Sequence, residues 1–199
     1  MIRFRTLLLV ALASLLSSVA FAQSSAWNID PNHSTAQFTV RHLVISNVTG
    51  SFTKVNGTVE LNEADITKSR VNAVIDAGSV DTRVPDRDND LRSPNFFDIE
   101  KYPTIEFKSK RITKSGDKVQ MIGDLTIHGT TREVTLDVDG PTPPIDDPWG
   151  NERRGFSATT TINRRDFGLV YNHLLKTGEA VVGETVKIQI DEEIKRPKI

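Results

Sequence analysis

The sequence predicts an all-β protein, an extended closed antiparallel β-barrel of about eight strands with short capping helices. Apolar and polar residues alternate in short runs along most of the chain, turns of hairpin length separate several runs, and no long amphipathic helix accompanies them. Since no helical layer could cover a sheet, the sheet must close on itself or fold into two layers. Closure is favoured because it removes exposed strand edges, and such a barrel is either filled by its own side chains or holds one ligand.

The chain begins with an export signal. Two arginines precede an apolar run at residues 7–16, and Ala20-Phe21-Ala22 supplies a small-x-small cleavage pattern. The run is shorter than the roughly 20 residues that a membrane-spanning helix needs. We therefore expect residues 1–22 to be a signal peptide cleaved near Ala22-Gln23. Residues 23–199 are expected to form one periplasmic or secreted domain without a membrane segment.

The strands are expected in a regular order along this domain. Alternation is clearest at residues 38–42, 59–61, 105–107, 119–127, 134–138, 156–162 and 186–190. Turns at residues 114–117 and 127–131 join neighbouring runs at hairpin lengths, so adjacent strands are expected to pair in order. Residues 141–154 contain four prolines and predict a long loop between strands.

Two stretches interrupt the alternation and predict short helices that cap an opening of the barrel. They are residues 84–98, where Pro94 limits the length of any helix, and residues 166–176.

The composition narrows the classes of partner and chemistry. The chain has 25 basic and 26 acidic residues, a formal net charge of −1, and no basic block that could follow a phosphate backbone, so no nucleic-acid partner is expected. It has no cysteine, which excludes disulfides, a thiol nucleophile and a thiolate metal site. A Gly-x-Ser-x-Gly nucleophile elbow is absent, and we do not expect an enzyme.

Several short segments occur in the order found in one known family. They are WNIDP at 27–31, FTVRH at 38–42, VTGSF at 48–52, FFD at 96–98, GDLTIHG at 123–129 and INRRDFG at 162–168. Together they resemble the YceI-like bacterial proteins, the polyisoprenoid-binding family. Two residues depart from that pattern: Asp90 stands where many relatives have histidine, and Asn95 where aspartate is common.

The resemblance implies a lipocalin-like barrel whose apolar pore encloses a long-chain isoprenoid or another amphiphilic lipid. It also implies an exported or periplasmic protein, often a homodimer, that transports, stores or scavenges the lipid and needs no other cofactor. The alternative is an envelope stress-related protein with a filled barrel that acts through protein contacts. Leu43 and Ile45, apolar beside Val44, which is predicted to face inward, are the candidates for such a contact or for a dimer seam.

The candidate ligand contacts lie on predicted inward faces and in the capping stretches. They are Phe38, Val40, His42, Phe52, Arg92, Phe96, Phe97, Phe107, Leu125, Phe156, Ile162, Arg164 and Phe167. Phenylalanine mixed with small Ala73 and Gly123 is compatible with a lined hollow. His42 is either a core histidine bonded to backbone or a polar group that touches ligand. Arg92 and Arg164 either form rim ion pairs or bind a phosphate or carboxylate head group.

No metal site is predicted. The four histidines form no His-x-His or His-x-x-x-His pair. The alternating carboxylates of residues 86–90 resemble a calcium loop in spacing, but they lack the glycine and the terminal glutamate that an EF-hand loop requires.

Overall fold

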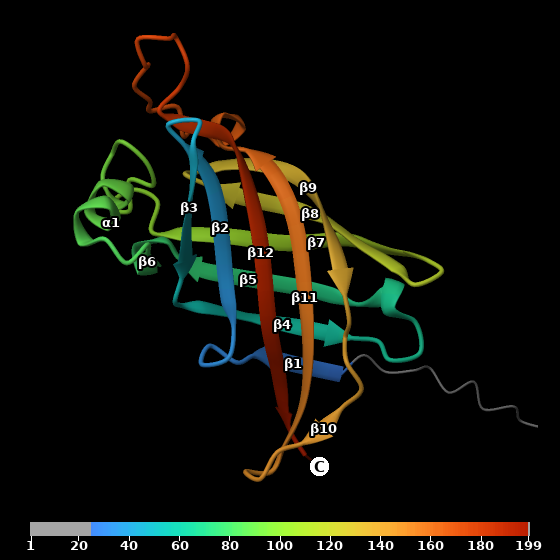
Figure 1. Ribbon diagram of the computed structural model, residues 1–199. Coiled ribbons are helices and arrows are strands. Elements are labelled where there is room, and N and C mark those ends of the chain that lie inside the picture. Colours follow the sequence, from blue (N-terminus) through green and yellow to red (C-terminus); the bar gives the residue numbers. More distant parts are fainter. Residues whose placement is uncertain (1–24, 199) are drawn as a thin grey trace, which may run out of the picture.

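The computed structural model describes residues 25–198, so the predicted signal peptide lies outside the described residues. These described residues form twelve strands (Figure 1): β1 (Ser25–Ile29), β2 (Thr35–His42), β3 (Ser46–Phe52), β4 (Val55–Leu61), β5 (Arg70–Asp76), β6 (Val80–Asp81), β7 (Thr104–Ser115), β8 (Lys118–Ile127), β9 (Thr130–Asp139), β10 (Ile145–Asp146), β11 (Asn151–Asn163) and β12 (Val182–Pro197). Helix α1 (Pro85–Arg92) and the 3-10 turns η1 (Ile66–Lys68), η2 (Ala77–Ser79) and η3 (Arg164–Phe167) complete it. Within residues 25–198, no helix has the length and apolar character needed to cross a bilayer.

Eight antiparallel strands close into a barrel in the order β1, β4, β5, β7, β8, β9, β11 and β12, with β12 returning to β1. The longest seam joins β11 to β12, from Asn151 opposite Pro197 to Asn163 opposite Thr185. The remaining edge of β12 pairs with β1 near its end and with β2 along its first part, so β2, β3 and β6 extend the wall on that side. The predicted closed barrel is confirmed.

The alternation in the sequence translates directly into an inner and an outer face. On β12, Val186, Ile188 and Ile190 face the interior, and the hydrophilic Lys187 and Gln189 between them face outward. The predicted hairpin between β8 and β9 is present, with Ile127 opposite Thr130. His128 and Gly129 form its two-residue turn and both have positive φ, of 50° and 69°, as a tight turn matching the strand twist requires.

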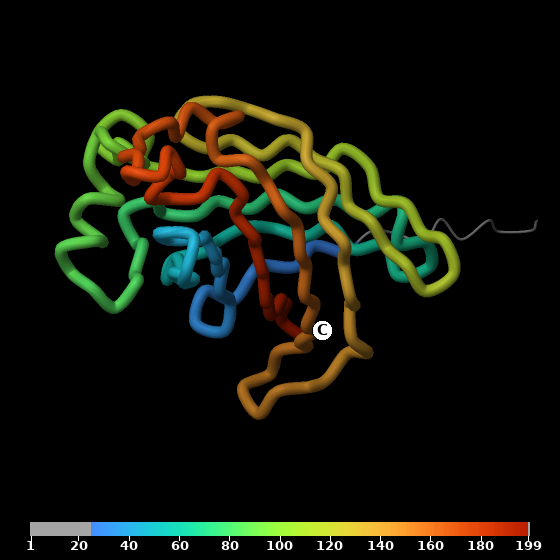
Figure 2. Tube along the Cα trace, turned by 45° about the horizontal axis from the view of Figure 1, so that its top comes forward, coloured from blue at the N-terminus to red at the C-terminus, as the bar shows by residue number. Residues whose placement is uncertain are grey.

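Both views place α1 and the loop that follows η3 at one end of the barrel, away from the C-terminus (Figures 1 and 2). The helix expected within residues 84–98 is present as α1. It starts with Pro85, at a position where a backbone N–H would have no partner within the helix, so proline costs no hydrogen bond there. The helix expected over residues 166–176 is wrong beyond Phe167. Gly168, at φ 78°, ends η3, and the chain continues as a loop closed by a bridge between Leu174 and Ala180.

Two further expectations need correction. The loop predicted at residues 141–154 is shorter, because β11 already begins at Asn151 and β10 pairs with it; the prolines lie outside both strands. Val44 does not face inward. It belongs to the turn between β2 and β3 with φ 65°, and 44% of its surface is exposed.

Candidate ligand-binding site

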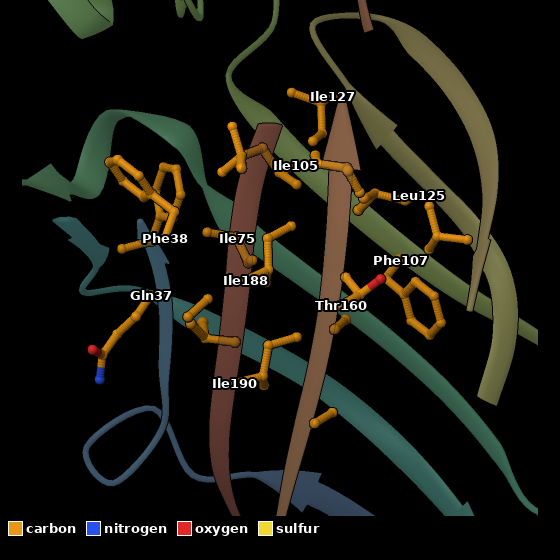
Figure 3. A pocket seen from close by; sticks show the side chains of 18 of the residues that line it. Gln37, Phe38, Ile75, Ile105, Phe107, Leu125, Ile127, Thr160, Ile188 and Ile190 are labelled. Carbon is orange, nitrogen blue, oxygen red and sulfur yellow. The ribbon is translucent and has the colours of Figure 1, made fainter. Parts of the chain in front are cut away.

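The interior of the barrel is hollow and its wall is almost entirely apolar. The cavity between the inward side chains has a volume of about 170 Å³. Figure 3 shows the inward-directed side chains from several strands: Ile75, Ile105, Phe107, Leu125, Ile188 and Ile190. Ligand pockets in proteins typically have a mainly apolar lining with a few polar groups, and the lining of this cavity is of that kind.

Most of the predicted contacts meet in this cavity. Its wall includes Phe38, Val40, Phe52, Phe96, Phe97, Phe107, Leu125, Phe156, Ile162 and Arg164. They come from β2, β3, β7, β8, β11, η3 and the turn after α1, and the barrel closure brings these elements together.

Three predicted contacts lie elsewhere. His42 is half-buried at the end of β2, one inward position beyond Val40, and is not part of the wall. The Arg92 guanidinium donates to the carbonyls of Gly78 at 2.8 Å and Val80 at 2.7 Å, so it fastens α1 to the sheet. Phe167 is 1% exposed and packs into the core beside the cavity.

Aromatic side chains gather where the capping segments meet the barrel. The Phe52 ring lies 5.8 Å from Phe38 and 5.5 Å from Phe97, measured between ring centroids. Phe96 makes an edge contact at 5.3 Å with Tyr171, in the loop after η3. The two capping segments therefore contact each other over one end of the cavity through aromatic pairs.

The two residues that depart from the family pattern contact each other. The Asn95 side-chain amide donates to the Asp90 carboxylate at 2.9 Å, and the Ser93 hydroxyl donates to the Asp90 carbonyl at 2.7 Å. All three side chains are on the exposed side of this segment. The pair thus ties the end of α1 to the turn that carries Phe96.

Small residues on the inward faces do two different things. Ala73 and Ala158 line the cavity and leave it open. Gly123, by contrast, makes room for a neighbour, because a Cβ there would lie 2.6 Å from the Phe107 ring. The small residues therefore have two roles: the alanines keep the cavity open, and Gly123 lets the Phe107 ring pack closely against β8.

Arg164 brings an unpaired positive charge to the cavity wall. It is 4% exposed, and its guanidinium donates to the backbone carbonyls of Gly183 at 2.9 Å, Val182 at 3.2 Å and Leu169. Burial lowers its pKa, but an arginine remains charged in proteins. The nearest acidic group that acts on it, Glu184, forms its ion pair with Arg165 at 2.8 Å. Among residues 25–198 no carboxylate lies within ion-pair distance of Arg164.

A second, smaller apolar chamber of about 40 Å³ adjoins the main cavity. Val71, Met121 and Phe156 line both spaces and so form the partition between them. Beyond the partition the chamber is lined by Leu61, Ile112 and other apolar residues.

One cluster has ligand types that could suit a metal, but cations of the protein already occupy it. In the described part of the chain, Asp30, His33 and Glu193 are the group whose ligand atoms lie within 4.8 Å of one another. The Arg153 guanidinium is 2.6 Å from Asp30 and 3.0 Å from Glu193, and the Lys195 ammonium is 3.2 Å from Asp30. The cluster is therefore a structural ion-pair network.

The network shifts the pKa of its buried member. Burial alone would raise the pKa of Asp30, but hydrogen bonds from Arg153, His33, the Asn32 amide and Lys195 lower it well below its ordinary value of 3.8. Asp30 is consequently a carboxylate whenever the protein is folded near neutral pH.

Sequence reasoning missed Glu192, an acidic residue of the cavity wall. The alternation that places Val186, Ile188 and Ile190 inside continues to residue 192, and the structure places Glu192 on the inner face. The signal was present but obscured, because Asp191-Glu192-Glu193 resembles a solvated charged run.

Comparison with known proteins gives a consistent result. The YceI-like domain matches residues 27–194. A UPF0312 protein of Pectobacterium atrosepticum is 36% identical over 167 residues, which cover 83% of this chain and 86% of that protein. The crystal structure of the Campylobacter jejuni YceI protein superimposes with a TM-score of 0.66 at 28% identity, covering 79% of this chain and 90% of that one.

A more distant structure has the same fold. It is a polyisoprenoid binding domain from Saccharophagus degradans, with a TM-score of 0.61 at 16% identity, covering 86% of this chain and 98% of that one. The family match spans nearly all of the described residues. The chain therefore belongs to the YceI-like domain family.

Proposed function

We propose that this protein is an exported binding protein that encloses a long-chain isoprenoid or another amphiphilic lipid in its barrel. The observation that carries the proposal is the cavity itself, with its nearly continuous apolar wall inside the closed barrel. A barrel that served only as a rigid surface would be filled by its own side chains. The description of the Saccharophagus domain as polyisoprenoid-binding agrees with this ligand class.

Burial of the chain would supply the affinity. Each methylene removed from water contributes about 0.8 kcal/mol, so about 20 methylenes contribute about 16 kcal/mol before costs. Lost translational and rotational freedom costs about 4 to 15 kcal/mol. Affinity of this origin depends mainly on chain length, so several lipids of similar length would compete for the cavity.

Arg164 would fix the orientation of the lipid. A guanidinium has five N–H donors, and three of those on Arg164 are used by backbone carbonyls. Two donors are left for a phosphate, a carboxylate or another oxygen-rich head group. Because Arg164 lies near the capped end, the head group would remain there and the chain would extend down the barrel.

Extraction of the purified protein with organic solvent, followed by mass spectrometry, tests the proposal. We expect a long-chain amphiphile in near-stoichiometric amount. Extraction of only trace lipid, together with no binding of added fatty acids or polyprenols, would contradict it. That outcome would favour a protein-contact role, for which the exposed apolar residues Ile45 and Leu174 are candidates.

A substitution of Arg164 tests the head-group contact. In Arg164→Met, we expect the Kd of a long-chain fatty acid to rise about tenfold, because a charge-assisted hydrogen bond is lost. The Kd of the fatty alcohol of equal length should change much less, and this probe controls for damage to the fold. Arg165→Met is the matched control, since Arg165 pairs with Glu184 on the surface. Equal losses for acid and alcohol would assign Arg164 a purely structural role.

A further inference from the structure

Glu192 is an acidic residue set in the apolar wall of the cavity. Its residue surface is 6% exposed, and it lies on the inner face of β12 opposite Phe156 of β11. It continues the inward series of Ile188 and Ile190 on the same strand. Figure 3 shows these two isoleucines. From Val182, at the Arg164 end, to Glu192 the strand advances about 30 Å, given a rise of about 3.3 Å per residue. Glu192 is thus far from the capped end.

The carboxyl group of Glu192 is incompletely satisfied. Its Oε2 atom is buried and has no hydrogen-bond partner in the described part of the protein. Burial raises the pKa of Glu192 to about 7. Two smaller influences oppose each other: a hydrogen bond from Ser34 lowers this pKa, and the nearby Asp191 charge raises it. A buried polar atom without a partner costs free energy, so its presence in an otherwise apolar wall requires a reason.

The charged groups around Glu192 are directed elsewhere. On β11, the terminal nitrogens of Arg154 contact Glu63 at 3.1 Å and the Thr142 carbonyl at 3.2 Å, while its buried Nε has no hydrogen-bond partner among residues 25–198. Next to β1, Asp30 is held by Arg153 and Lys195. No cation contributes to the pKa of Glu192. The Glu192 side chain therefore lines the cavity without a charge partner among residues 25–198.

We propose that Glu192 is a recognition residue that hydrogen-bonds an uncharged oxygen, a hydroxyl or a carbonyl, on the enclosed chain remote from the Arg164 end. The inference rests on the proposed function, because it needs a long molecule in the barrel. It adds that the ligand carries polar groups at two separated places. A protonated carboxyl donates to either oxygen type, whereas an ionised carboxylate can only accept, and so binds a hydroxyl but not a carbonyl.

Matched probes test the inference in the intact protein. The probes are saturated fatty acids of increasing length and their ω-hydroxy derivatives, measured by calorimetry. At the chain length that reaches Glu192, we expect the ω-hydroxyl group to strengthen binding to the wild-type protein. This gain in affinity should be about tenfold larger than the gain measured with Glu192→Leu. Shorter ω-hydroxy acids should show no such gain. Asp191→Asn is the matched control, since Asp191 is the exposed neighbour on the outer face of β12.

The pH dependence gives a second readout. We expect a fatty acid that ends in a methyl ketone to bind well at about pH 6 and to lose about tenfold in affinity at about pH 8, on either side of the pKa of about 7. The affinity for the ω-hydroxy acid should be similar at both pH values. The Glu192→Gln variant should bind the ketone with equal affinity at both pH values, because a glutamine side chain cannot ionise.

The possible failures are distinguishable. If no fatty acid of any length binds, the proposed function itself is contradicted. If plain fatty acids bind but the ω-hydroxyl gives no gain over Glu192→Leu at any length, only the role of Glu192 is overturned. Preferential binding of a ω-amino acid would overturn the choice of an uncharged oxygen, because Glu192 would then pair with a cation.

Discussion

Replacing Ala73 with tryptophan is expected to weaken lipid binding about 100-fold while leaving the barrel folded. Ala73 lies on β5 between Gly57 of β4 and Phe107 of β7, and its side chain lines the middle of the cavity wall. An indole ring there would fill space that a chain needs. Since each excluded methylene removes about 0.8 kcal/mol, loss of three to four methylenes would weaken binding by about 100-fold.

The neighbouring position provides the control for this variant. Val74 is on the same strand, 41% exposed, and faces outward, so Val74→Trp adds the same ring without entering the cavity. Extracted lipid and the affinity for a fatty acid should fall in Ala73→Trp and stay at the wild-type level in Val74→Trp. Thermal denaturation should show little change in either variant, whereas a filled core would lose about 1 to 3 kcal/mol on accepting the ring. Normal binding by Ala73→Trp would show that the ligand does not occupy the barrel.

Replacing Arg153 with methionine is expected to lower the free energy of unfolding by about 3 kcal/mol at neutral pH. The Arg153 guanidinium contacts Asp30 at 2.6 Å and Asp147 at 2.6 Å, and 12% of its side-chain surface is exposed. Asp30 is 1% exposed, so removal of its partner leaves a buried carboxylate that Lys195 and His33 compensate only in part. Urea denaturation at neutral pH measures the loss.

The pH dependence of this variant follows from the lowered pKa of Asp30. A carboxyl group whose pKa is lower in the folded state contributes stability above its unfolded pKa, near 3.8, and loses that contribution as the pH falls below it. The wild type should therefore lose stability on acidification more steeply than Arg153→Met, and the difference between them should shrink below about pH 4. Arg165→Met, which breaks an exposed pair, should cost no more than about 1 kcal/mol. A similarly small cost for Arg153→Met would show that the ion-pair network around Asp30 contributes little to the stability of the fold.

The barrel was predictable because its strands have one apolar and one polar face. The alternation around Ile188 and the hairpin before Thr130 each follow from local residue pattern, and closure follows from the lack of covering helices. β1 was missed because only Trp27 and Ile29 mark its buried face over five residues. The loop after η3 was mistaken for a helix because its apolar residues are close to helical spacing, although Val170 and Leu174 are in fact exposed.

The polar features of the interior were harder to predict. Asp30 and Arg153 are 123 residues apart, and nothing in either local segment indicates that the barrel closure brings them together. Arg164 was a candidate for either a rim ion pair or a head-group contact, but its unpaired state is a tertiary property. Glu192 follows the inward alternation of β12, yet the acidic residues on both sides of it suggest a surface strand. In each case charge alone suggested solvent, and burial was decided by distant parts of the chain.

The partition formed by Val71, Met121 and Phe156 has a consequence for which molecules the barrel can hold. It is made of side chains, not of hydrogen-bonded backbone, so a rotation about the χ angles of Phe156 and Met121 would join the two chambers while every strand pairing stays intact. Capacity would then increase in one step, and not gradually with each added carbon. Bound chains would then fall into two classes: short chains that end at the Phe156 ring, and long chains that displace this ring.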